Sequence, residues 1–238
     1  MNIENSIFKA ETLKLSLLII LITGIFILLY GCIEPSRDEV ALYDSLKSKY
    51  DCEIDIRKGI SNASGEDEKI YFQISILNCK QIDNSDFEAS VIALEAFKTI
   101  AEKNITHINV EISDDLYSFQ LSDLKQVEKA ESYYYEIFES IKNNQFDVLY
   151  RDLWENVKKD ITLSKFTSSL QTISSGMEFI NLKIDGFKLI NERINGTDLE
   201  AILIEGSFGK DKKKRNTFKL YVPNEFKKKI YGIDIYSK

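Results

Sequence analysis

The chain has 238 residues and a formal net charge of −7; 44% of its residues are hydrophobic and 29% are charged. This composition is ordinary for a globular protein of one or two domains. The acidic balance argues against general nucleic-acid binding, which requires a basic surface. With only two prolines and ten glycines, the chain has little room for long disordered spacers.

The first feature along the chain is an uncharged apolar run over residues 15–33, which is preceded by two lysines. It is long enough to span a hydrocarbon core of roughly 30 Å. Its end, Leu29-Tyr30-Gly31-Cys32, resembles a bacterial lipobox, where a signal peptidase cuts before a cysteine that carries lipid. The resemblance implies that Cys32 opens the mature protein and holds it through several acyl chains. Tyr30 departs from the usual small or aliphatic residue, so a retained helix with Cys32 at its outer end is the second interpretation.

Both interpretations place residues from about 33 onward on the extracytoplasmic face of the cell envelope. By the same resemblance, Ile33 instead of aspartate suits the outer membrane of a cell with two membranes. We therefore divide the chain into four predicted parts. They are a signal peptide or anchor (1–31), a tether (32–40), an N-terminal α+β domain (41–125) and a C-terminal α+β domain (126–238).

Two cysteines remain once Cys32 is assigned to lipid. Cys52 and Cys79 bracket two alternating apolar runs, 52–57 and 70–77, which predict a β-hairpin. In an oxidising compartment this pair could form a cross-strand disulfide.

The register of this hairpin conflicts with the disulfide. Matching the apolar faces pairs Ile54 with Ile76, which puts Cys52 opposite Asn78, and a one-residue slip would turn every side chain to the other face. A bulge near the strand end would reconcile the two requirements. The alternative is two separate buried thiols.

The N-terminal domain is predicted to contain a further strand pair around a helix. Ser85 and Glu88 fit a capping box that opens a helix to about Lys103. Alternating residues then predict two strands, 107–112 and 117–121. With a weak helical pattern over 40–50, the predicted order is helix, β-β-α-β-β.

Ser122 is expected to cap one long helix that runs to about Asn143 and contains the domain boundary, near 125–130. The elements expected after it are a helix over 144–157, a helix capped by Ser164 and ended by Gly176, and strands near 185–193, 199–208, 217–222 and 229–236. Helices followed by long antiparallel strands resemble the cone-shaped α+β fold of nuclear transport factor two and ketosteroid isomerase, in particular extracytoplasmic modules without known activity. The resemblance covers roughly 131–238 and implies a pocket between helices and sheet.

Four residues of the 144–157 helix could face such a pocket: Asp147, Tyr150, Asp152 and Glu155. A carboxyl group in an apolar pocket could act as an acid or base, but solvated helix charges and a packed tyrosine are the more frequent outcome. The single histidine, His107, cannot build a histidine-based metal site. We predict no catalytic residue, cofactor or metal.

Two surface features complete the sequence evidence. A basic run contains Lys210, Lys212, Lys213, Lys214 and Arg215. It is either a soluble hairpin tip, where lysines discourage edge pairing, or a contact with an anionic partner or lipid surface. The Tyr133–Tyr135 cluster cannot share one helix face, because neighbours point about 100° apart, so we expect one or two of these rings in the core.

The sequence therefore predicts a non-enzymatic lipoprotein of the cell envelope. Its expected partners are the membrane, through Cys32 or a retained helix, and an envelope protein or a small apolar ligand. The alternative is a small-molecule-binding or acid–base enzyme that uses the C-terminal pocket.

Overall fold

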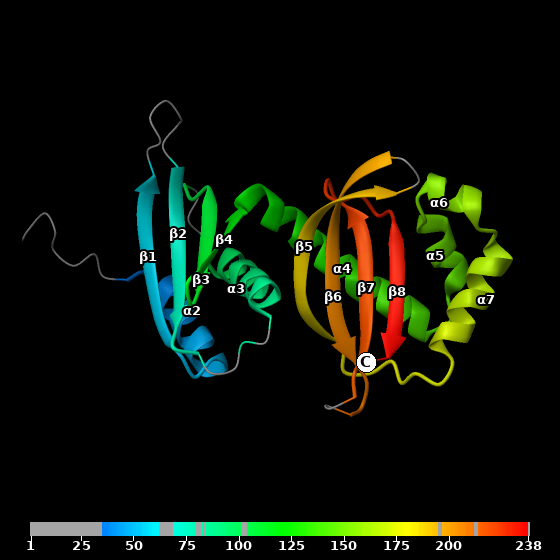
Figure 1. The fold of residues 1–238 in the computed structure, drawn as a ribbon, viewed down its shortest axis with the longest axis horizontal. Coiled ribbons are helices and arrows are strands. Elements are labelled where there is room, and N and C mark those ends of the chain that lie inside the picture. Colours follow the sequence, from blue (N-terminus) through cyan, green and yellow to red (C-terminus); the bar gives the residue numbers. More distant parts are fainter. Residues whose placement is uncertain are drawn as a thin grey trace, which may run out of the picture. The chain divides into compact units, whose positions relative to one another are not determined.

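The computed structural model describes residues 35–237 apart from 62–68, 80, 81, 83, 101–103, 195, 196, 212 and 213. The chain is a mixed α+β protein with two four-stranded sheets (Figure 1). Residues Asp38–Lys238 form one compact unit. Within the described ranges, no helix has the length and apolar character needed to cross a bilayer. The predicted anchor, with Cys32, lies outside the described residues.

The first sheet contains strands in the order β1-β2-β3-β4. The elements that build it are α2 (Arg37–Lys49), β1 (Glu53–Ser61), β2 (Lys69–Leu77), α3 (Ser85–Thr99), β3 (His107–Ile112) and β4 (Asp115–Gln120). Only β2 and β3 pair in parallel, and α3 supplies the crossover that a parallel pair requires. The predicted order of helix, β-β-α-β-β is confirmed.

One face of this sheet is apolar because its strands alternate. The buried apolar residues of β2 and β3 are Phe72, Ile74, Ile76, Ile108, Val110 and Ile112. Leu42 and Leu46 of α2 and the alanine-rich side of α3 pack against this core. Burying side chains of this size contributes roughly 1.5–3 kcal/mol each, so the alternation read from the sequence identifies the main stabilising face.

The starts of α2 and α3 differ from prediction. Helix α2 begins at Arg37, inside the predicted tether. Asn84, not Ser85, caps α3, because its side chain accepts from the Phe87 amide at 3.4 Å. Ser85 is already helical, and its hydroxyl lies 2.7 Å from the Tyr117 hydroxyl. Asn and Ser both offer a capping oxygen, so the sequence does not decide which of two adjacent residues caps the helix. The contact of Ser85 with Tyr117, which is distant in the sequence, leaves the capping position to Asn84.

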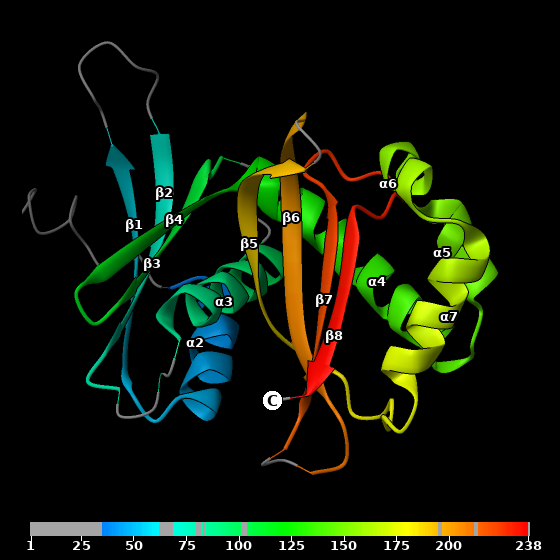
Figure 2. The ribbon, with the colours of Figure 1, turned by 45° about the vertical axis from the view of Figure 1, so that its right-hand side comes forward.

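The second sheet is an antiparallel meander in the order β5-β6-β7-β8. Its elements are α4 (Leu121–Lys142), α5 (Phe146–Asp152), α6 (Glu155–Asp160), α7 (Leu163–Ser174), β5 (Lys183–Ile194), β6 (Thr197–Phe208), β7 (Asn216–Pro223) and β8 (Gly232–Ser237). Figure 2 shows α4 behind this sheet. Helix α4 passes through residues 125–130 without a break; a division into two domains there stays a prediction.

The predicted single helix over 144–157 is wrong. The chain is extended at Leu153 and Trp154, between α5 and α6. Leu153 forms a parallel β-bridge with Ile230, and the Trp154 amide donates to the Ile230 carbonyl at 2.8 Å. Leu153 pairs with a residue 77 positions away by the numbering, and this pairing is more stable than continuation of the helix. Thr162 rather than Ser164 caps α7.

Helix α3 also packs on β5, far away in the sequence. The Phe187 amide donates to the buried Ser90 hydroxyl at 2.9 Å. Gly186 permits this approach, because a Cβ there would lie 2.5 Å from the ring of Phe87. Lys188 adds an ion pair with Asp86 at 2.8 Å. Elements of the two predicted domains are therefore joined by packing as well as by α4.

Candidate functional site

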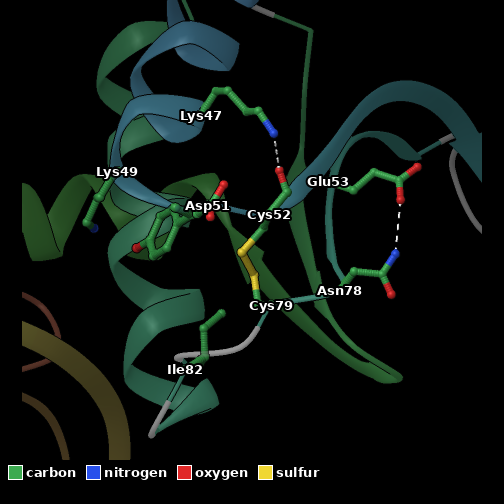
Figure 3. A pocket seen from close by; sticks show the side chains of 9 residues that line it. Lys47, Lys49, Asp51, Cys52, Glu53, Asn78, Cys79 and Ile82 are labelled. Carbon is green, nitrogen blue, oxygen red and sulfur yellow. Dashed lines mark hydrogen bonds between the residues drawn. A yellow bond between two sulfur atoms is a disulfide. The ribbon is translucent and has the colours of Figure 1, made fainter.

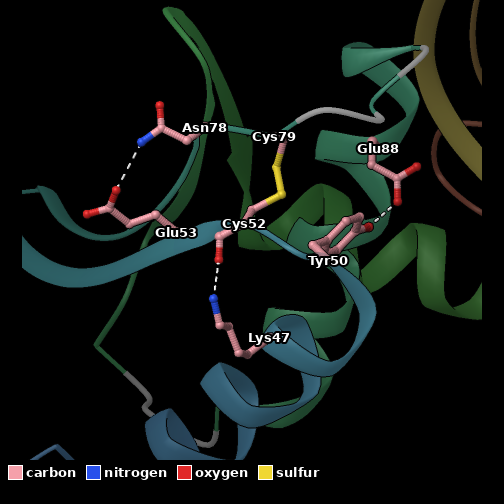
Figure 4. Close-up of a disulfide and its surroundings, with 7 residues drawn as sticks. All are labelled: Lys47, Tyr50, Cys52, Glu53, Asn78, Cys79 and Glu88. Atoms are coloured by element: carbon pink, nitrogen blue, oxygen red, sulfur yellow. Dashed lines mark hydrogen bonds between the residues drawn. A yellow bond between two sulfur atoms is a disulfide. The ribbon is translucent and has the colours of Figure 1, made fainter.

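The cysteine pair lies where β1 begins and β2 has ended. Cys52 and Cys79 form a disulfide whose Cα atoms are 4.9 Å apart (Figure 4). The strand register is the predicted one, with Ile54 opposite Ile76, and it contains no bulge. The conflict is resolved by Asn78, which has a left-handed φ of 59° just after β2. Asparagine tolerates this conformation, and it turns Cys79 toward Cys52.

A hollow of about 510 Å³ lies beside this disulfide (Figure 3). Its lining contains basic residues, Lys47 and Lys49, and acidic residues, Asp51 and Glu53. The Lys47 ammonium group donates to the Cys52 carbonyl at 2.5 Å. The Tyr50 hydroxyl donates to Glu88. Burial, followed by the bond to Glu88, raises the pKa of Tyr50 far above its ordinary value, so the phenol is a neutral donor. These contacts hold the end of α2 to α3.

A second hollow, of about 380 Å³, forms an apolar groove between α3, α4 and β5. We call it the α3–β5 groove. Its apolar lining residues are Val91, Leu94, Tyr135, Leu182, Ile184 and Phe187. Tyr135 is 42% exposed, and burial of the remainder raises the pKa of its phenol. Lys98 and Glu131 form an ion pair in the lining of the groove, which also contains Glu95 and Lys183. An apolar floor with charges of both signs around it suits an apolar side chain of a partner.

The C-terminal interior is packed with aromatic rings. Phe138 lies 5.3 Å from Phe179 and from Phe208, and 5.7 Å from Phe218, measured between ring centroids. The Tyr134 hydroxyl donates to the Phe218 carbonyl at 2.8 Å. Tyr133 and Tyr134 are buried while Tyr135 is exposed, which confirms the expected division of this cluster. Side chains therefore occupy the space in which a pocket was expected.

Three of the four candidate residues on α5 and α6 make contacts elsewhere, and the fourth is exposed. Asp152 accepts from the Tyr133 hydroxyl at 2.7 Å, and the Tyr150 hydroxyl donates to the Ile161 carbonyl at 3.1 Å. Asp147 is exposed. Glu155 is also exposed, and its hydrogen bond to Lys158 lowers its pKa. No arrangement of an acid beside a base emerges from these four.

The basic run is only partly described, because Lys212 and Lys213 lie outside the described residues. Lys214 is exposed. Arg215 is half-buried, and its guanidinium donates to the carbonyls of Ser207, at 2.8 Å, and Asn181. Arg215 therefore braces the β6–β7 hairpin, and a membrane or anionic contact of this run stays a prediction.

His107 begins β3 as expected and is half-buried. Its Nδ1 atom lies 3.0 Å from the Thr106 hydroxyl. In the part of the chain that the structure describes, no group of three or more histidine, cysteine or acidic side chains is placed to hold a metal ion.

Two features were missed by the sequence reasoning. Glu205 and Lys219 face each other across β6 and β7 and form an ion pair at 2.9 Å, with Glu205 buried. The hydrogen bond that Lys219 donates to Glu205 raises the pKa of Lys219 above its ordinary value. Trp154, the only tryptophan, lines a third hollow. The alternation of apolar and polar residues in β6 and β7 could have suggested the Glu205–Lys219 pair. Nothing in the sequence around Trp154 indicates the hollow that it lines.

Comparisons of the chain with protein families, with curated proteins and with solved structures found no match.

Proposed function

We propose that this protein is a non-catalytic binding protein of the bacterial cell envelope, tethered through Cys32 on the extracytoplasmic side. Its partner is another envelope protein, which docks an apolar side chain into the α3–β5 groove. The C-terminal residues are proposed to be a cone-like module, with support from the order of its elements, helices before the β5–β8 meander.

The observation that carries the binding role is the contrast between a filled interior and an apolar groove outside it. Aromatic rings at 4.8–5.7 Å from each other occupy the space between α4 and the second sheet. This packing disfavours a small apolar ligand or an acid–base reaction there. The groove instead leaves Tyr135 exposed beside apolar lining. Aromatic residues are enriched at protein–protein contacts.

The extracytoplasmic location has separate support. Disulfides persist in oxidising compartments and are rare where thiols are kept reduced. Cys52 and Cys79 are at bonding distance without a change of strand register. Intact mass after membrane extraction tests the tether: we expect a species that begins at Cys32 with added acyl mass. An unprocessed chain beginning at Met1 would reject it.

Site-specific photo-crosslinking in intact cells tests the groove. We would place a photoreactive phenylalanine analogue at Tyr135 and, as the matched control, at Tyr43. Both are helical tyrosines of similar exposure, 42% and 40%. We expect a discrete protein adduct from position 135 that is missing at position 43 and is lost with Val91→Glu, which puts a charge in the groove. Equal adducts at both positions, or none at 135, would refute the groove as the docking site.

A further inference from the structure

We propose that the hollow beside Trp154 binds a neutral saccharide. The hollow has a volume of about 370 Å³, within the roughly 300–1,000 Å³ of small-molecule sites. Two aromatic rings line it, Trp154 and Tyr231, whose centroids are 5.1 Å apart at an interplanar angle of 59°. Both side chains are half-buried, so each ring retains surface that a ligand can cover. This site shares no residue with the α3–β5 groove.

The fold holds the tryptophan in place by its backbone. Its amide donates to the Ile230 carbonyl at 2.8 Å, and the Ile230 amide donates to the Asp152 carbonyl at 2.8 Å. The preceding Leu153 is buried and forms the β-bridge with Ile230. The break between α5 and α6 therefore fixes Trp154 against the β7–β8 connection. The contact with the Tyr231 ring restricts the indole itself, so binding costs little further side-chain freedom.

Asn224 lines the same hollow and carries a buried hydrogen-bond acceptor. The Asn224 Oδ1 atom is shielded from solvent and accepts no hydrogen bond from the described residues. Its backbone amide donates to the Glu200 carbonyl at 3.1 Å, which anchors the residue. A buried amide oxygen without a donor is costly. Asn224 is half-buried as a residue and lines the hollow, so a rotation of its amide would bring this acceptor to a ligand hydroxyl.

The charges of the lining favour a neutral ligand. Glu200 and Glu225 contribute two carboxylates, and Lys227 and Lys229 contribute two ammonium groups, so the formal charges cancel. Lys229 also lies 4.0 Å from Glu155. A phosphate ligand would meet the carboxylates without a surplus of positive charge. A pyranose instead offers a C–H face for the aromatic rings and a rim of hydroxyls for amide, carboxylate and ammonium groups.

The only tryptophan of the chain makes binding directly visible. The full chain, in a zwitterionic detergent without sugar headgroups, would be titrated with maltotriose, with chitotriose and with inorganic phosphate while Trp154 fluorescence is followed. We expect a saturable change with at least one of the two sugars at millimolar concentration and none with phosphate. No saturable change with either sugar, or the same response to phosphate, would overturn the proposal.

Variants locate the binding by calorimetry. Trp154→Ala is expected to weaken sugar binding by about tenfold, because it removes the aromatic contact. Asn224→Ala tests the acceptor separately, should the first variant fold poorly. Tyr43→Ala, which removes an exposed ring elsewhere, and Val91→Glu in the groove should bind sugar like the unmodified chain. Unchanged affinity in both the Trp154 and Asn224 variants would refute the site, without bearing on the groove.

Discussion

Removal of the Cys52–Cys79 disulfide should destabilise the protein strongly. The bond joins residues that are 27 positions apart. A loop of this length loses enough entropy in the unfolded chain for the bond to contribute about 3.6 kcal/mol at 25 °C. With a urea m-value of roughly 2 kcal/mol/M, the double variant Cys52→Ala/Cys79→Ala should unfold at a urea concentration about 1.8 M lower. Its m-value should also rise, because the unfolded chain expands.

Equilibrium unfolding of the full chain in urea measures this effect. Far-UV circular dichroism follows all elements, and fluorescence follows Trp154, which lies outside the sheet that contains the disulfide. The two signals should shift together, because residues 38–238 form one compact unit. The unmodified chain with a reducing agent should reach the midpoint of the variant.

Two results would refute this reasoning. A midpoint unchanged within error would show that the bond does not restrict the unfolded chain. A shift in circular dichroism alone, with the Trp154 transition unmoved, would show that the two sheets unfold independently and would support the predicted boundary near residue 125.

Three further substitutions test individual contacts by the same urea assay. Ser90→Ala leaves a buried β5 amide without its acceptor and should cost about 1–3 kcal/mol; a loss below the error of the assay would contradict a stabilising role of the Ser90–Phe187 hydrogen bond between α3 and β5. Lys219→Met takes the cation from buried Glu205 and should cost roughly 3 kcal/mol. Because the pKa of Lys219 in the folded chain is raised, this contribution should persist at neutral pH and fade only well above pH 10.5, the ordinary pKa of lysine; equal stability of variant and unmodified chain at pH 7 would contradict it. Asp86→Asn should cost about 0.5 kcal/mol through the exposed pair with Lys188. The pKa of Asp86 is lowered, by Lys188 first, so the difference should be present above its ordinary pKa and vanish as pH falls through the lowered one; a difference that grows in acid would contradict this sign.

The sequence alone determined the features that depend on neighbours along the chain. Alternation identified the β1–β2 hairpin and its register, including Ile54 opposite Ile76. Helical spacing identified α4, Leu121–Lys142, with its end within one residue of the expected 143, whereas Gln120 and not the expected Ser122 precedes its first turn. The order of helices and strands followed from the same periodicities, because burying one face requires a fixed repeat of apolar residues.

Only the tertiary structure decided the features that depend on distant partners. The sequence could not choose between a bulge and the left-handed turn at Asn78 that brings Cys79 to Cys52. It predicted one helix across Leu153, where pairing with Ile230 interrupts it. Helical propensities amount to less than about 1 kcal/mol per residue, so a buried long-range contact outweighs them. That interruption also places Trp154 in the hollow for which we propose saccharide binding.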